Sequence, residues 1–400
     1  MPSSGFIRLV SLFVTAWLAA SSGASSAQIY RLPPPDTTAG NFFGAAVAVH
    51  DDSAVIGASG TDACGANSGA AYVYRRIENG EWRQTAMLVP TDCHERHFFG
   101  RAVDVGADRV VVTSHRPYFR ESTSNAVYVF ERQAGSNDWI QTARIVDPDD
   151  GARGPFAASV SLDEDRLLVT SGGDATSGDE HGTAWIYERR PDGTWTVAAR
   201  LAPSLGPDTG VFGVSGALDG DRAVVAASRY FDERPGLLYV FERESDGSWV
   251  ETDQIAGIDD FYMSVDIRGE WLIAGESRGG RSGAGQARLF KRRDDGRWRS
   301  TATLRPSSPY AHGGFGTEVS LGDDRALVSG FDEQLELDVN IDRVVYVFRL
   351  DENGTRWRQS RIVDVGDTAF GAAIDLQGRT AIIGQVSDER PGQAYVVRIQ

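Results

Sequence analysis

Long apolar segments are nearly absent from this chain of 400 residues, and so is lysine. After residue 27 no stretch approaches the roughly 20 predominantly apolar residues that a transmembrane helix requires. The sequence therefore predicts a protein that does not span a membrane. Lysine occurs once, at Lys291, and arginine supplies all the other basic side chains. We interpret this preference as genome composition or as tolerance of salt, two interpretations that the sequence does not separate.

Positive charge is also scarce, because 40 Lys and Arg residues face 56 Asp and Glu residues and give a formal net charge of −16. A surface this acidic repels phosphate backbones and anionic lipid head groups. We therefore expect neither nucleic acid nor a membrane surface as a partner. The hydrophobic content of 41% is high enough to bury a sizeable core, which excludes a disordered chain.

Familiar catalytic motifs are missing as well. No G-x-S-x-G, Walker loop, C-x-x-C or paired-carboxylate motif stands in a convincing context. The segment Cys93-His94-Glu95-Arg96-His97 misses the metalloprotease H-E-x-x-H spacing by one residue and lies in an expected loop. A small zinc site on His94 and His97 is the alternative to a disulfide beside exposed loop histidines, which we favour. We name no catalytic residue and no metal ligand, and an enzyme is the less favoured interpretation.

The first 27 residues have the layout of a secretory signal peptide. Arg8 precedes an apolar run from Leu9 to Ala20, and small residues follow up to Ala27. This order of a basic start, an apolar middle and small residues is typical of an exported protein. We place the cleavage after Ala27, with cleavage after Ala24 as the alternative. The expected location is secreted or periplasmic.

The chain contains two cysteines, Cys64 and Cys93. In an exported protein such a pair indicates a disulfide. The repeat described next places both in loops on the same face of the first unit, which supports pairing. Two unpaired buried thiols are the alternative.

Internal repetition is the strongest signal in the sequence. A phenylalanine opens each of seven units, at intervals of 49 to 57 residues, and glycine follows it in five of the seven. The opening residues are Phe43, Phe99, Phe156, Phe212, Phe261, Phe315 and Phe370. We therefore divide residues 28–400 into seven copies of one structural unit.

Each unit reads as four strands. An alternating strand such as Val103 to Val105 is followed by an acidic turn, and then by a continuous apolar run such as Val110 to Val112. A longer loop leads to an aromatic strand, and an Asn-Gly or Asp-Gly turn then begins a hairpin. The fourth strand opens with a tryptophan in six units, at Trp82, Trp139, Trp195, Trp249, Trp298 and Trp357.

The seventh unit stops after its third strand, at Gln393 to Ile399, and the missing strand lies at the other end of the chain. Gln28 precedes Phe43 by the same 15 residues that separate Gln141 from Phe156. The segment from Gln28 therefore supplies the outer strand of the last unit and closes a ring, which leaves few exposed strand edges. The sequence predicts an all-β fold, a seven-bladed β-propeller with four antiparallel strands in each blade.

The Phe-Gly openings, the glycine before an aromatic strand and the W-x-x-x-x-x-L strand resemble the FG-GAP repeats of integrin α-subunit propellers, and most closely their stand-alone bacterial relatives. The resemblance covers nearly all of residues 28–400. It implies the propeller fold, whereas it is weak for function because one fold hosts many activities. The fifth blade departs from the pattern, with Tyr262–Met263 after Phe261 and Arg288 in place of an aromatic residue. We expect a distorted or partly exposed blade there.

Integrin-like propellers often hold calcium in a D-x-D-x-D-G loop between the first two strands of a blade. The corresponding connections here are short turns such as Asp51–Asp52 and Asp323–Asp324. Calcium takes 6–8 oxygen ligands, which two or three acids in a hairpin do not supply. We therefore expect no integrin-type calcium and no other cofactor.

Loops on one face of the ring hold the candidate binding residues. This long-loop face carries the connections between second and third strands and between successive blades. Aromatic residues beside arginines are the kind of anchors that dominate recognition surfaces. The candidates are Tyr118, Phe119, Arg120, Tyr230, Phe231, Arg234 and Tyr310, and the alternative is that these rings cover their own blades. Five of the six histidines, His94, His97, His115, His181 and His312, also fall in these loops, whereas His50 lies at the opposite turn.

Three functions follow from these observations. The favoured one is an exported, non-catalytic binding module that recognises a protein or a glycan through the long-loop face. The second is a hydrolase or lyase that acts on an extracellular polymer at the mouth of the central channel. The third is a structural part of a cell-surface assembly.

Overall fold

The computed structural model describes thirteen stretches of the chain, and everything below concerns these residues. They are 28–35, 38–115, 125–149, 156–172, 182–204, 210–228, 235–258, 263–280, 283–307, 313–331, 343–366, 369–387 and 389–399. None of these stretches contains a helix that is long and apolar enough to cross a membrane.

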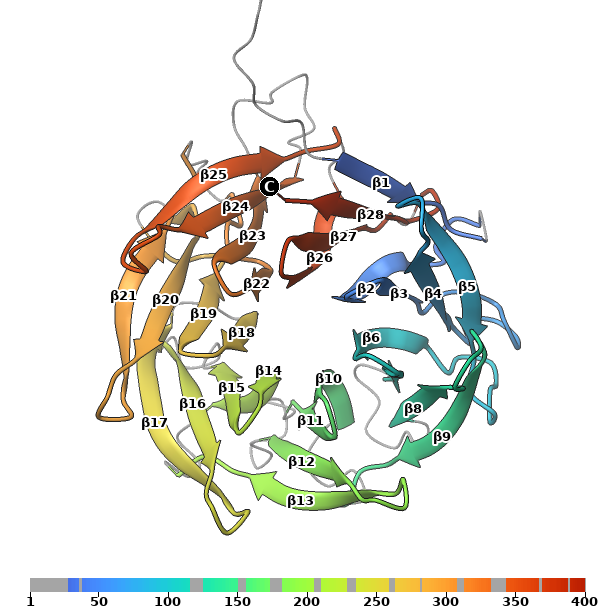
Figure 1. The fold of residues 1–400 in the computed structure, drawn as a ribbon, viewed down its shortest axis with the longest axis horizontal. Helices are drawn as coiled ribbons and strands as arrows, with labels where there is room; N and C mark the ends of the chain where they lie inside the picture. The colour runs from blue at the N-terminus through green and yellow to red at the C-terminus, as the bar shows by residue number, and fades with distance from the viewer. Residues whose placement is uncertain are drawn as a thin grey trace, which may run out of the picture.

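Seven four-stranded antiparallel sheets are arranged as blades around a central axis (Figure 1), which confirms the predicted all-β, seven-bladed propeller. The innermost strands are β2 (Phe43–His50), β6 (Phe99–Val105), β10 (Phe156–Asp163), β14 (Val211–Asp219), β18 (Val265–Arg268), β22 (Val319–Leu321) and β26 (Phe370–Gln377). The second strands are β3 (Ser53–Ala58), β7 (Arg109–Ser114), β11 (Arg166–Ser171), β15 (Arg222–Ser228), β19 (Trp271–Glu276), β23 (Arg325–Phe331) and β27 (Thr380–Gln385). The third strands are β4 (Ala70–Arg76), β8 (Ala126–Arg132), β12 (Thr183–Arg189), β16 (Gly236–Arg243), β20 (Gln286–Arg292), β24 (Arg343–Leu350) and β28 (Gln393–Arg398). The outermost strands are β5 (Trp82–Leu88), β9 (Trp139–Ile145), β13 (Trp195–Leu201), β17 (Trp249–Ile258), β21 (Trp298–Leu304), β25 (Trp357–Val363) and β1 (Gln28–Leu32).

The N-terminal strand closes the ring as the sequence predicts. β1 pairs antiparallel with β28 from Gln28 opposite Arg398 to Leu32 opposite Ala394, so the seventh blade has the strand order β1-β28-β27-β26. Leu32 is buried in the core between the seventh and first blades. The two ends of the chain are therefore joined by backbone hydrogen bonds and by shared apolar contacts.

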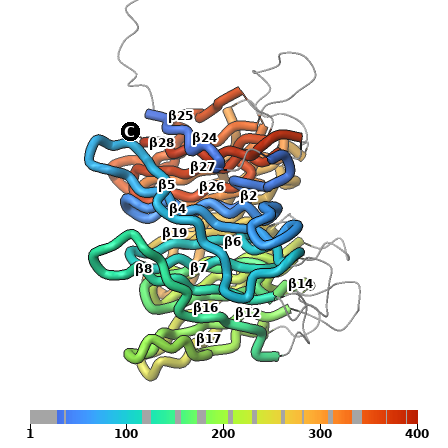
Figure 2. The backbone as a smooth tube through the Cα atoms, turned by 90° about the vertical axis from the view of Figure 1, so that its right-hand side faces the viewer, coloured from blue at the N-terminus to red at the C-terminus, as the bar shows by residue number. Residues whose placement is uncertain are grey.

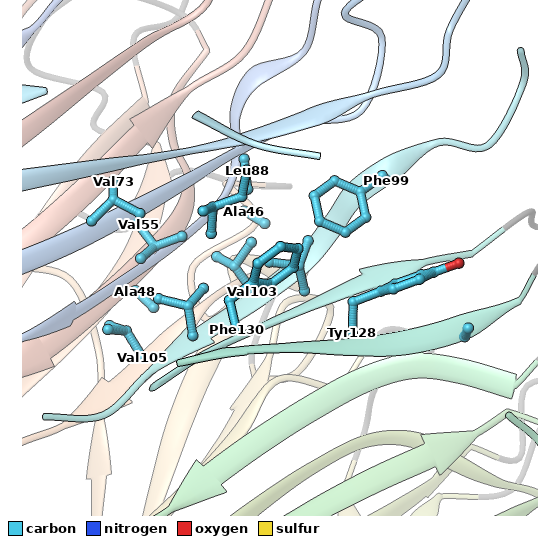
Figure 3. Close-up of a cluster of buried hydrophobic side chains, with 14 residues drawn as sticks. Ala46, Ala48, Val55, Val73, Leu88, Phe99, Val103, Val105, Tyr128 and Phe130 are labelled. Atoms are coloured by element: carbon cyan, nitrogen blue, oxygen red, sulfur yellow. The ribbon is translucent and has the colours of Figure 1, made fainter. Parts of the chain in front are cut away.

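The hydrophobic core is divided into seven clusters, each lying between two consecutive blades. Figure 3 shows the cluster between blades one and two, where Val55 and Leu88 of the first blade face Phe99 and Phe130 of the second. Each repeated tryptophan packs against the cluster shared with the preceding blade, as Trp139 does here. Aromatic side chains bury large apolar areas. The repeated phenylalanine and tryptophan therefore serve the contact between blades.

The glycine that follows the opening phenylalanine is required by close packing. At Gly100, φ is +94°, and a Cβ atom would lie 2.3 Å from the carbonyl oxygen of Ala70 in the previous blade. Gly44 has the same constraint against Gln393, which lies in the last blade. Glycine alone adopts this backbone conformation without steric cost and leaves room for the neighbouring chain. The Phe-Gly dipeptide is thus a consequence of how tightly successive blades approach.

The two faces of the ring differ in their connections. The turns between first and second strands, such as residues 51–52 and 164–165, share one face with the hairpins between third and fourth strands. Figure 2 shows the ring from the side, with the hairpin after β8 on the left. We call this side the short-turn face. The long-loop face holds the connections between second and third strands and between blades, such as residues 59–69 and 89–98.

The fifth blade forms four strands despite its unusual sequence, although Phe261 lies outside the described residues. Arg288 stands where the other blades have an aromatic residue. Its guanidinium forms an ion pair with Glu276, a side chain that is 0% exposed, and Gln286 Nε2 also donates to Glu276 at 2.7 Å. A buried, hydrogen-bonded ion pair has therefore replaced the aromatic contact in this blade.

Candidate functional site

The innermost strands line the central channel and have no further strand on their inner side. Their inward-facing backbone amides therefore need other hydrogen-bond partners. Many of these partners come from the position five residues after each opening phenylalanine. We call this position the channel collar, and it is occupied by Ala48, Asp104, Ser161, Ala217, Asp266, Ser320 and Asp375.

Each collar aspartate accepts hydrogen bonds from two innermost strands. Asp104 Oδ1 accepts from the amide of Val105 at 2.7 Å, and Oδ2 accepts from the amide of Leu162 in the next blade at 2.6 Å. The same arrangement recurs for Asp266 with Ile267 and Leu321, and for Asp375 with Leu376 and Val49.

Ser161 completes the set, since its Oγ accepts from the amide of Leu218 at 3.1 Å. The three aspartates and this serine thereby satisfy the equivalent amide of all seven blades. The collar links innermost strands across five blade boundaries, two to three, three to four, five to six, six to seven and seven to one.

The three collar carboxylates also act on one another electrostatically. Burial raises the pKa of Asp104 to about 8, and repulsion from Asp375 and Asp266 adds to this rise. Burial likewise raises the pKa of Asp266 to about 7, and it raises the pKa of Asp375. The backbone amides that donate hydrogen bonds to these carboxylates oppose the rise in pKa, because they stabilise the ionised form.

A fourth acid lies two residues before the collar, in blade six. Ser264 Oγ donates to Glu318 Oε2 at 3.1 Å, and burial raises the pKa of Glu318 to about 7, with Arg343 opposing the rise. The pKa of Arg343 is lowered, again through burial. The channel wall therefore contains several carboxyl groups that change charge near neutral pH.

Perturbed carboxyl groups in a channel can mark a catalytic site, so their geometry decides what they can do. Both oxygens of each collar aspartate already accept a backbone amide. His50, whose charge would favour ionised Asp375, has its Nδ1 3.0 Å from the side-chain amide of Gln377. This arrangement holds neighbouring strands together, and it directs no carboxylate–histidine pair toward a shared point.

The long-loop face of the first blade is fixed by the predicted disulfide, which the structure confirms. Cys64 and Cys93 are joined with a Cα–Cα distance of 6.0 Å. Cys64 lies in the loop between β3 and β4, and Cys93 lies in the connection from β5 to β6. The bond therefore ties a loop within the blade to the connection that leads to the next blade.

A hydrogen-bonded cluster lies beside the disulfide. Tyr128 Oη donates to Asp92 Oδ2 at 3.1 Å and lies 3.0 Å from His97 Nε2, and Arg144 forms an ion pair with Asp92 at 2.9 Å. Burial raises the pKa of Tyr128 to about 12. Tyr128 therefore stays protonated at neutral pH and links the connection to the second blade.

The expectation of exposed loop histidines beside the disulfide is wrong at one position, His97. His97 is 0% exposed, because its ring lies against Tyr128 of the third strand. His115 is also buried, with its Nδ1 3.1 Å from the carbonyl oxygen of Phe156, and burial lowers its pKa to about 4. His94 is exposed, as expected. His181 and His312 lie outside the described residues.

All seven candidate binding residues lie outside the described part of the chain, so their roles stay predictions. They are Tyr118, Phe119, Arg120, Tyr230, Phe231, Arg234 and Tyr310. Within the described stretches, no group of three or more His, Cys, Asp or Glu side chains is arranged to hold a metal ion.

The collar was not foreseen from the sequence, although a signal for it exists. Asp104, Asp266 and Asp375 each stand between two apolar residues, in Val-Asp-Val, Val-Asp-Ile and Ile-Asp-Leu. An acid at one fixed position in an otherwise apolar strand, repeated in three blades, distinguishes these residues from the many acids in turns.

Comparison with known proteins supports the architecture. A family model described as FG-GAP repeat matches residues 27–74, 82–130 and 139–187, which is about a third of the chain. No curated protein matches the sequence. Among solved structures, the crystal structure of RRP9 WD40 repeats is similar, with a TM-score of 0.59 and 10% sequence identity. The match covers 94% of this chain and 100% of that one, and at this identity it shows the fold alone.

Proposed function

We propose that this chain, which is an FG-GAP repeat propeller, is an exported, non-catalytic binding module that recognises a protein or a glycan through its long-loop face. The observation that carries this proposal is that structural hydrogen bonds occupy the carboxylates of the channel collar. Its three carboxylates all accept hydrogen bonds from backbone amides, and the fourth acid of the channel wall, Glu318, accepts from Ser264 Oγ. Binding is therefore favoured over hydrolysis or lyase chemistry at the channel mouth.

The two faces of the ring also differ in a way that supports this assignment. On the short-turn face, Asp163 and Asp219 accept the turn amides of Gly220 and Gly269 in the following blades, at 2.6 and 2.7 Å. The turns there are short and locked to one another. The long-loop face has longer connections, and the disulfide holds two of them in place. Variable loops on a rigid scaffold are where recognition residues concentrate.

The long-loop assignment is tested by substituting Tyr118→Ala and Tyr230→Ala together and comparing capture of ligands from the protein and polysaccharide fractions of the secreted material. The variant should lose the captured ligand. A control with Met87→Ala and Ile140→Ala removes exposed apolar side chains, 45% and 47% exposed, from outermost strands and should retain it. Equal capture by the variant and the native protein would remove these aromatic residues from the binding surface.

Export is tested separately by fractionating cells and sequencing the N-terminus of the mature protein. Cleavage after Ala27 produces a protein that begins at Gln28, the first residue of β1. Full-length protein that remains in the cytoplasm would contradict the proposed location.

A further inference from the structure

The short-turn face carries a series of ion pairs that runs from blade two to blade five. In blades two, three and four, the residue after the second aromatic position of the third strand is Glu131, Glu188 or Glu242. Each glutamate pairs with an arginine of the following blade, namely Arg189 at 2.8 Å, Arg243 at 3.1 Å and Arg292 at 2.8 Å. Positive charge on these blades is thereby neutralised locally.

This series ends at the fifth blade, where Lys291 stands in the position of the glutamates and Leu350 stands where the next arginine would be. The Lys291 ammonium lies 5.1 Å from the ring centroid of Trp271, and Trp271 contacts Trp357 of blade six edge to face. An aromatic contact thus replaces the ion pair between blades five and six. The basic residues beyond this point have no glutamate partner of this series.

The hairpins of these two blades are consequently basic. Residues 291–299 contain five basic and two acidic residues, a net charge of +3, and residues 349–358 contain three and two, a net charge of +1. The equivalent hairpins of blades one to four have net charges of +1, −1, 0 and −2 over residues 75–83, 131–140, 188–196 and 242–250, so blade five is the most basic of the six. Figure 1 shows the β20–β21 and β24–β25 hairpins next to each other on the left of the ring. We call the set of Lys291, Arg293, Arg297, Arg299, Arg349, Arg356 and Arg358 the arginine rim.

The arginines of the rim are available to a ligand. All six are exposed. Arg297 pairs with Asp253 at 3.3 Å and Arg349 pairs with Asp324 at 3.8 Å, whereas among the described residues Arg293, Arg299 and Arg358 form no ion pair with a carboxylate. The nearby acids Asp295 and Asp351 instead accept the amides of Arg297 and Thr355 and so shape the turns.

We propose that the arginine rim binds a linear polysaccharide that carries carboxylate groups, such as a chain of uronic acids. Guanidinium groups bind carboxylates through paired, charge-assisted hydrogen bonds. This site lies on the face opposite to the loops of the proposed function and does not depend on that assignment.

Two observations favour this occupant over an acidic protein or a nucleic acid. Protein interfaces have a core of aromatic and other apolar side chains. The large apolar residues that are exposed in the described part of the chain, Ile29, Met87, Ile140, Val146, Val197 and Val250, all lie outside blades five and six. Duplex DNA carries about one charge per 1.7 Å, and the net charge of −16 on the whole chain repels so dense a polyanion. A polysaccharide with one carboxylate per sugar meets the rim with less repulsion from the surrounding surface.

The experiment measures binding of a fluorescently labelled alginate oligosaccharide, a chain of uronic acids, at low and at physiological salt. The test variant is Arg293→Gln/Arg299→Gln/Arg356→Gln/Arg358→Gln. The matched control, Arg83→Gln/Arg101→Gln/Arg190→Gln/Arg398→Gln, removes four exposed arginines from other blades and makes the same change in net charge. Thermal melting of both proteins verifies that the fold is retained.

We expect the rim variant to bind about tenfold or more weakly, since four exposed ion pairs are lost together, and the control to stay within about twofold of the native protein. Equal weakening in both variants, or no binding by the native protein at low salt, would overturn the proposal. Stronger competition by polyglutamate would assign the rim to an acidic protein, and stronger competition by duplex DNA would assign it to nucleic acid. The Tyr118→Ala/Tyr230→Ala protein should bind alginate normally, so this proposal and the long-loop function fail independently.

Discussion

Replacing Asp104 by asparagine should change how the stability of this protein depends on pH. In the native protein, both oxygens of Asp104 accept backbone amides, while burial and two other carboxylates raise its pKa to about 8. The unfolded pKa of an aspartate is about 3.9. The native state therefore binds one more proton than the unfolded state between these values. Because the native state holds the extra proton, the free energy of unfolding must fall as the pH rises through this window.

The size of the effect follows from the number of protons. One proton corresponds to about 1.4 kcal/mol per pH unit, so Asp104 contributes a loss of at most about 3 kcal/mol between pH 5 and pH 7. Asparagine keeps only one of the two acceptor oxygens, so at pH 5 the Asp104→Asn protein should be less stable by about 1–3 kcal/mol, the cost of one unsatisfied buried amide. Between pH 5 and pH 8 this deficit should shrink, because only the native protein loses stability through ionisation of Asp104.

The assay is urea unfolding, followed by tryptophan fluorescence at pH 5, 6, 7 and 8. Comparing the two proteins at each pH cancels groups common to both, including His115, whose lowered pKa makes stability fall toward acid pH. An Asp294→Asn protein is the control, because it makes the same change in charge at an exposed hairpin residue. Parallel stability curves for the native and Asp104→Asn proteins would refute the reasoning, as would a native protein that gains on the variant toward pH 8.

Three further changes test the architecture. Leu32→Ala should lower the free energy of unfolding by about 2–5 kcal/mol, because Leu32 is 1% exposed in the core that joins the two ends of the chain; unaltered stability would contradict ring closure by β1. Cys64→Ser/Cys93→Ser should lower the free energy of unfolding by about 3–4 kcal/mol, a value that follows from the sequence separation of 29 residues between the two cysteines. Reductant should lower the urea midpoint of the native protein but not that of the variant. Arg288→Ala should cost about 3–5 kcal/mol in a thermal or urea unfolding experiment, because it leaves Glu276 buried without its cation, whereas Glu276→Ser/Arg288→Tyr should recover most of the loss. Equal stability of these last two proteins would show that the buried pair is not the reason.

The parts of the fold that sequence patterns predict are those that repeat. Phe99 and Trp139 recur at fixed positions because every blade must pack against its neighbour in the same way, and that requirement appears seven times along the chain. The ring closure was predictable because Gln28 is in phase with Gln141 relative to the next phenylalanine. A packing requirement that recurs in every blade leaves a periodic pattern in the sequence, and that pattern can be recognised without knowing which residues are in contact.

The candidate site was less predictable because its residues are distant in the sequence and meet across the ring. Asp104 and Asp375 affect each other's protonation, yet they lie in the second and seventh blades. His97 is an ordinary loop residue in the sequence, and its burial depends on Tyr128, which is 31 residues away. A chain with 56 acids offers no reason to single out three of them until the blades place them on one channel.

The sequence by itself determined the number of blades, the strand order within each blade and the junction of the two ends. These features depend on spacing along the chain, which a repeat preserves. The tertiary structure alone decided which carboxylates share the channel and which arginines lack a partner at the rim. Both depend on contacts between different blades, because the charge of a side chain is neutralised by whatever lies beside it in space.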